Sequence, residues 1–183
     1  TTILKPGKRS NGKQTLAIVK RLIRYLGAQL PKTVIVFRGD SHFAYHEVMD
    51  WIDNQENVHH VTGLTGYPIL QEQVKAHVQR AKKLYKELKR PVRLYHSLYY
   101  QADSWNKHRR VVAKIEMTEH GLDLRFVVTD MEQAKANVLY NEIYCHRGNA
   151  ELYIKDHKLY LKSDRTSCHR FVANQSRLFL SSV

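Results

Sequence analysis

The feature that most constrains the fold is an alternation of short apolar strands and amphipathic helices in the first third of the chain. Thr33–Phe37 is a continuous run of mostly β-branched and aromatic residues, which is typical of a strand buried on both faces. A helical pattern from Thr15 to Leu30 precedes it, a second helix around Trp51 comes after it, and Val58–Thr62 is another short strand. This alternation predicts an α/β fold with a parallel pair of strands.

The middle of the chain has a different character. A long basic helix is expected over Ile69–Arg90, followed by an aromatic strand over Val92–Tyr100 and by two strands that flank the hairpin turn Glu119–Gly121. Residues 130–183 are expected to be mainly helical. We therefore interpret residues 63–129 as a mostly β insertion subdomain between residues 1–62 and 130–183, the two parts of one core.

The charge balance points to a polyanionic partner. The 183 residues include 30 Lys and Arg against 17 Asp and Glu, a formal net charge of +13. Nucleic acid fits best, because Lys and Arg gain affinity by releasing phosphate counterions, although a basic surface without a ligand is the alternative. No apolar stretch reaches the roughly 18–20 residues of a membrane span. Two isolated cysteines suggest a reducing cytoplasm.

Asp40 is the first candidate for chemistry. It comes directly after the predicted strand Thr33–Phe37 and the residues Arg38-Gly39. Ligands of open α/β sheets bind outside the carboxyl ends of strands, so a carboxylate there is well placed to contact a bound ligand. The alternative is that Asp40 only caps the next helix by accepting a backbone N–H.

A second candidate group is spaced for one face of a helix. Steps of three, four and seven residues place its members within roughly 60° of one another on a regular α-helix. Its carboxylate could hold a hard cation and its cations could bind phosphate. A solvated helix face with an Arg–Glu pair is the alternative. The group consists of Tyr144, Arg147, Glu151 and Lys158.

The same spacing resembles the Tyr-Arg-Glu-Lys signature of a group of bacterial insertion-sequence transposases. Further stretches resemble one branch of that group, the insertion-sequence family "thirteen-eighty". These stretches are Leu4-Lys5-Pro6-Gly7-Lys8, Arg38-Gly39-Asp40-Ser41-His42, Arg109-Arg110-Val111-Val112-Ala113-Lys114, Arg125-Phe126-Val127-Val128-Thr129, Tyr144-Cys145-His146-Arg147-Gly148 and Asp164-Arg165-Thr166-Ser167.

The resemblance implies a ribonuclease H-like fold and an Asp-Asp-Glu triad that binds two Mg²⁺ or Mn²⁺ ions. Asp40 matches the second Asp and Glu151 the Glu, and carboxylates that share two metals are expected within roughly 4–8 Å of each other. The first Asp is expected on a strand upstream of Thr1, since Thr1–Lys32 contains no acidic residue. One long side of Thr33–Phe37 is then expected to lack its partner strand.

The implied function is cleavage of DNA at the ends of a mobile element and transfer of the freed strand to target DNA, by a homodimer in the DNA complex. Tyr144, Arg147 and Lys158 are the implied DNA-binding residues, and Trp105 is expected either to stack on a DNA base or to lie in the insertion core. The alternatives are a catalytically inactive DNA-binding remnant and a metal-dependent nuclease of the same fold. A zinc site at Asp40, His42 and His46 is a minor alternative, because no further ligand falls at a suitable spacing.

Overall fold

The computed structural model describes residues 11–162 and 167–180, without the side chains of residues 147–151 and 161. Two compact units make up the chain, and each is described by itself. The larger unit is Gly12–Cys145, and the smaller unit contains His146 and the helices that come after it.

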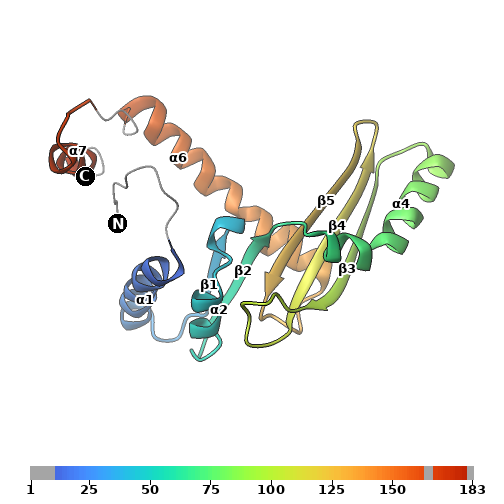
Figure 1. Cartoon of the computed structure of the whole chain (residues 1–183), viewed down its shortest axis with the longest axis horizontal. Helices are drawn as coiled ribbons and strands as arrows, with labels where there is room; N and C mark the ends of the chain where they lie inside the picture. The colour runs from blue at the N-terminus through green and yellow to red at the C-terminus, as the bar shows by residue number, and fades with distance from the viewer. Residues whose placement is uncertain (1–10, 163–166, 181–183) are drawn as a thin grey trace. The chain divides into compact units, whose positions relative to one another are not determined.

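A single five-stranded sheet organises the larger unit (Figure 1). Its order is β1-β2-β5-β4-β3, in which β1 and β2 are parallel and all other neighbours are antiparallel. Strands on both sides of position 63 therefore belong to one sheet, and the division at 63 and 129 stays a prediction. The strands are β1 (Ile35–Gly39), β2 (Val58–Leu64), β3 (Val92–Tyr100), β4 (Arg109–Thr118) and β5 (Gly121–Thr129).

Four helices lie on one face of this sheet. The helices α3 and α4 cover β3, β4 and β5 with a core that includes Leu70, Val74 and Ile115, all fully buried. The helices α1 and α2 form a smaller core around Val19 and Ile52. The face is apolar because alternate residues of each strand point to the same side. The helices are α1 (Gly12–Gln29), α2 (His46–Ile52), α3 (Pro68–Gln73) and α4 (Lys75–Leu88).

The opposite face of the sheet is covered in its middle by a short irregular helical region. It consists of α5 (Ala136–Val138) and the π-helical segment η2 (Leu139–Tyr144). Buried Leu139 and Tyr140 pack there against valines of the sheet, which are Val61, Val112 and Val127.

Strand β1 differs from its prediction. It is the edge strand, with β2 as its partner on one side and no strand on the other among the described residues. Its side chains are only partly covered, and Val34 just before it is 54% exposed. Burial on both faces is therefore wrong, whereas the expectation that one long side lacks a partner is confirmed within the described part of the chain.

Two local predictions meet different outcomes. The single basic helix expected over Ile69–Arg90 is wrong, because the chain breaks at Val74 (φ −101°, ψ 5°) into α3 and α4. The hairpin turn between β4 and β5 is confirmed, and Gly121 adopts φ +105°, a conformation that favours glycine.

The smaller unit contains α6 (Gly148–Leu161) and α7 (Phe171–Leu180), close to the two helices expected there. Hydrophobic side chains of both helices are exposed, including Tyr153, Tyr160 and Val172. Within the ranges described, neither unit has a helix with the length and apolar character needed to cross a bilayer.

Candidate functional site

Asp40 lies where the sequence places it, just beyond the carboxyl end of β1. Because β1 and β2 are parallel and Gly39 pairs with Thr62, the carboxyl ends of both strands meet at this edge of the sheet. The side chain of Asp40 is 41% exposed. A carboxylate in this position can reach a ligand that binds outside the strand ends.

Asp40 also caps the short 3₁₀ helix η1 (Ser41–Phe43). Its Oδ1 accepts a hydrogen bond from the backbone N–H of His42 at 2.9 Å, and the Nδ1 atom of His42 lies 3.4 Å from the same oxygen. The two interpretations of Asp40 are therefore compatible, because the cap holds Oδ1 and fixes the direction of the carboxylate.

Gly63 brings Tyr144 to the same corner of the sheet. A Cβ atom at Gly63 would lie 2.8 Å from the hydroxyl oxygen of Tyr144 and 3.0 Å from the backbone nitrogen of Ser41. A side chain at position 63 would force the phenol or the turn after Asp40 to shift, so glycine allows both to approach β2 this closely. Tyr144 and Asp40, 104 positions apart by their numbers, are thus neighbours in the fold.

A hydrogen bond further ties the segment with Tyr144 to β1. The guanidinium of Arg38 donates to the carbonyl oxygen of Ile143 at 2.8 Å. The ring of Tyr144 also lies 5.5 Å, centre to centre, from that of Tyr140. Burial raises the pKa of the Tyr140 hydroxyl well above its usual range, so this phenol is neutral and serves as packing. Contacts with both β1 and β2 therefore hold the segment that contains Tyr144 at the corner next to Asp40.

The helical group is only partly brought together. Tyr144 ends the π-helical segment, and a 3₁₀ turn over Cys145–Arg147 precedes α6, so one regular α-helix from Tyr144 to Lys158 is wrong. Positions 151 and 158 are about two turns apart within α6, and Lys158 is exposed. The side chains of Arg147 and Glu151 lie outside the described residues, so the expected approach of Glu151 to Asp40 stays a prediction.

A metal site can be assessed only from the donors that are described. Asp40 offers carboxylate oxygens, the ligands that Mg²⁺ prefers, so its chemistry fits a hard cation. Within residues 11–162 and 167–180, apart from side chains not described, no three His, Cys, Asp or Glu groups could together hold a metal ion. The zinc alternative gains no support, because Asp40, His42 and His46 do not form such a group in the described part of the chain.

Comparison with known proteins agrees with these features. Residues 1–183 match the family described as transposase DDE domain group 1. The chain belongs to this family. No curated protein and no solved structure matches it.

Membership implies a metal-dependent phosphoryl-transfer enzyme with DNA as its partner. A mixed α/β fold with a five-stranded sheet is consistent with such a transposase domain. The family also uses divalent metals in general, which agrees with the oxygen donors of Asp40. Whether a residue can contact DNA depends on its exposure, and the candidate residues differ in exposure.

Trp105 lies in the core of the transposase domain. It is 6% exposed, and its ring packs edge-on against Tyr100 with 5.4 Å between ring centres. Stacking on a DNA base needs an exposed ring face. The structure therefore favours the core role that the sequence left open for Trp105 over a DNA contact.

Sequence reasoning missed a partly buried polar cluster that joins β2 to the end of β5. Asp130 accepts a hydrogen bond at 2.8 Å from the backbone N–H of His60 and lies 2.8 Å from Nδ1 of His59. His60 is fully buried, and burial lowers its pKa to about 4. A separation of 70 positions between His60 and Asp130 leaves no spacing signal, so only the sheet register reveals the cluster.

Two buried arginines in the stretch that resembled the family have structural roles. Arg109 is 3% exposed. It pairs with two carboxylates, Asp50 of α2 and Asp53 directly after α2. Arg110 donates to the backbone carbonyls of the segment after β5, at Met131, Glu132 and Ala134. Their charges are satisfied inside the protein, so they are not DNA contacts.

Proposed function

We propose that this chain is the catalytic part of a DNA transposase that cleaves DNA at element ends and joins the freed strand to target DNA. The observation that carries the proposal is the position of Asp40. Its half-exposed carboxylate stands at the carboxyl ends of two parallel strands, held by a cap, in a chain that belongs to a DDE transposase family.

Asp40 and Glu151 are the carboxylates that we assign to divalent metal binding, with Mg²⁺ or Mn²⁺ as the ion. Ions held in such sites lower the pKa of an attacking water or 3′-hydroxyl and stabilise the leaving oxygen. Asp40 contributes an oriented carboxylate, because the His42 N–H holds one of its oxygens. A third carboxylate, the first Asp of the triad, would come from outside the described residues.

The other residues of the group act on DNA rather than on the metal. We assign Arg147 and Lys158 to phosphate contacts, since guanidinium and ammonium groups bind phosphate oxygens strongly. Tyr144 would donate a hydrogen bond near the scissile phosphate, because its hydroxyl lies over Gly63 beside the turn after Asp40. The protein would act as a homodimer on DNA.

The proposed fold is ribonuclease H-like, with the free edge of β1 as the place of the strand that carries the first Asp. Two observations support this placement. The edge has no partner among the described residues, and Val34 beside it is exposed although apolar. Long apolar edges are normally paired or covered in natural proteins. The strands of residues 63–129 would form the family's β insertion, fused here to the core sheet.

Strand cleavage in the presence of Mg²⁺ tests the proposal. The full transposase protein should nick DNA that carries its own element ends, and Asp40→Asn or Glu151→Gln should lower the rate by at least about 100-fold, the scale of losing a group that acts in the transition state. Glu119→Gln is the matched control, because Glu119 is a highly exposed carboxylate in the β4–β5 turn.

Each alternative has its own outcome in this experiment. Cleavage without joining of the 3′ end to target DNA would indicate a nuclease. DNA binding without cleavage under Mg²⁺ or Mn²⁺ would indicate an inactive remnant. Full activity of Asp40→Asn would contradict the assignment of Asp40.

A further inference from the structure

A groove between α4 and β4 lies on the face of the sheet that α4 covers. Its volume is about 520 Å³. The floor contains the thioether of Met117 and the ring of Tyr85, both partly buried against the main core. Its remaining lining residues are Gln79, Lys82, Lys83 and Lys86. The groove therefore joins an apolar floor to a cationic rim.

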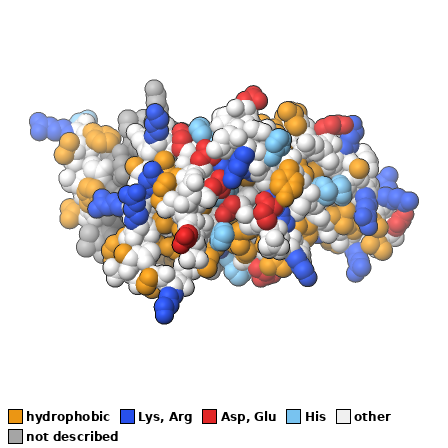
Figure 2. All heavy atoms as spheres, turned by 90° about the horizontal axis from the view of Figure 1, so that it is seen from below, with side chains coloured by type: hydrophobic (Ala, Val, Ile, Leu, Met, Phe, Trp, Pro, Cys, Tyr) orange, Lys and Arg blue, Asp and Glu red, His pale blue; other side chains and the backbone are white. Residues whose placement is uncertain are grey.

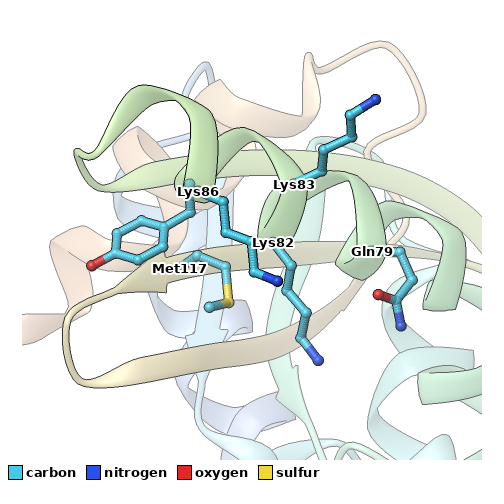
Figure 3. A pocket seen from close by; sticks show the side chains of 6 residues that line it. Gln79, Lys82, Lys83, Lys86 and Met117 are labelled. Atoms are coloured by element: carbon cyan, nitrogen blue, oxygen red, sulfur yellow. The ribbon is translucent and has the colours of Figure 1, made fainter.

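The lysines of the rim differ in their surroundings. Lys82 and Lys86 take part in none of the ion pairs found among the described residues, whereas Lys83 lies 3.9 Å from Glu87 and Lys75 lies 2.9 Å from Glu72. Figure 3 shows Lys82 and Lys86 reaching toward the side of Met117, while the ammonium of Lys83 points away from it. The two uncompensated charges thus belong to the groove.

Position along α4 gives these charges a regular spacing. Lys82 and Lys86 are four residues apart, or about 6 Å along the helix axis, on the same helix face. Lys75 and Gln79 continue this line at steps of four and three residues. Figure 2 shows Lys and Arg side chains gathered beside hydrophobic ones at the right, where Figure 1 places α4.

We propose that this groove binds a single-stranded segment of DNA, with its phosphates on Lys82 and Lys86 and a base against Tyr85 and Met117. Cationic grooves with aromatic floors bind single strands because every base has a face that can stack. A DNA duplex also presents phosphates, but its base faces are stacked inside the helix and cannot contact the apolar floor. The inference rests on the proposed function for the choice of DNA.

The groove would bind DNA separately from the metal carboxylates. Asp40 does not line it. A strand freed by cleavage or frayed at an element end is the kind of DNA that such a groove would hold. Binding there needs no metal and no chemistry, which makes the groove testable without an active enzyme.

Fluorescence anisotropy of the intact chain with a labelled oligothymidylate, titrated at several salt concentrations, tests the lysines. Each phosphate contact on a single strand contributes about 0.7 to the slope of log K against log salt. Lys82→Gln and Lys86→Gln should each lower the slope by about 0.7. Arg80→Gln is the matched control, an exposed cation of the same helix that does not line the groove, and it should change the slope by less than half as much.

The apolar floor is tested from both sides of the interface. Tyr85→Leu should weaken oligothymidylate binding about tenfold, the low end of the range for stacking on one base, while Tyr85→Phe should leave it unchanged. A chain of abasic sugar-phosphates should bind the unmodified protein about tenfold more weakly than oligothymidylate, and this comparison needs no variant that must fold.

Three results would overturn the inference. Equal effects of Arg80→Gln and Lys82→Gln would make the lysines a general positive surface. Equal binding of the abasic chain would remove the base contact, and equally strong competition by polyglutamate would show that any anion suffices. Asp40→Asn should keep full oligothymidylate binding, so loss of cleavage and loss of groove binding are separate outcomes.

Discussion

The two ends of the sheet differ in how completely they are covered. At the β3–β4 end, which we call the closed end, α3 and α4 cover Val111, Ala113 and Ile115, and the first seven residues of β4 are all buried, although Val92 is the only buried residue of the edge strand β3. At the β1 end, which we call the open end, no residue of β1 before Gly39 is buried. Leu22 and Leu26 of α1, and Leu30 directly after α1, are at least 40% exposed.

This difference places the candidate chemistry at the less stable end. Local stability depends on buried apolar contacts, and regions with few of them open at lower free energy. Asp40 extends from the open end, whereas the proposed single-strand groove lies on the closed end. The proposed groove is therefore backed by a large buried core, whereas Asp40 lies at the end where β1 has few buried apolar contacts.

The largest expected effect separates the two ends directly. Ile115→Ala should lower the free energy of unfolding by about 2–5 kcal/mol, because it leaves a cavity in the closed end. Leu26→Ala, at a side chain already 40% exposed, should cost less than about 1 kcal/mol. Urea unfolding followed by circular dichroism measures both, and equal losses would show that the outer face of α1 is covered after all.

The pH dependence of stability tests the part of the sheet between the two ends, because the buried His60 lies there on β2. The unfolded chain binds a proton at histidine near pH 6.5, but burial lowers the pKa of His60 in the folded protein to about 4. Stability is therefore full above about pH 6.5 and declines as pH falls toward 4, by up to about 3 kcal/mol.

Unfolding of His60→Leu across the same pH range provides the control. The variant should lose most of this dependence, leaving the smaller effect of His96, whose pKa burial also lowers. An unchanged profile in His60→Leu would show that the buried imidazole does not titrate on unfolding.

A smaller effect tests the corner that holds Tyr144. Gly63→Ala places a Cβ 2.8 Å from the Tyr144 hydroxyl and should destabilise by about 1–3 kcal/mol, the usual cost of overpacking. In a Tyr144→Phe background the cost should fall, since the hydroxyl that the new carbon meets is gone. Thermal unfolding of the four proteins gives the coupling, and a coupling of zero would mean that the two groups are not in contact.

The smallest expected effect on stability concerns the free edge. Val34→Lys should change the free energy of unfolding by less than about 0.5 kcal/mol, because Val34 is exposed. It should nevertheless slow aggregation, since a charged residue at a sheet edge opposes pairing with another chain. Light scattering during incubation measures this, and an unchanged aggregation rate would show that the edge of β1 is already protected.

The sequence alone determined where most elements lie and that a carboxylate stands directly after β1. Strand and helix periods predicted α1, β2, the β4–β5 hairpin and α7 within a few residues, because those patterns record which side of an element is apolar. The position of Asp40 after a strand could also be predicted from the order of residues along the chain, whereas the free side of that strand was an implication of the family resemblance.

The tertiary structure decided the properties that depend on contacts between distant segments. Trp105 is in the core, Arg109 and Arg110 bind carboxylates and carbonyls, and Tyr144 reaches the corner of Asp40 through a π-helical segment and a glycine. Periodicity reports the spacing of side chains within one element and carries no information about which residue from a distant segment lies opposite. The pairing of strands into a sheet supplies that information, and so it determines which charges remain free for a ligand.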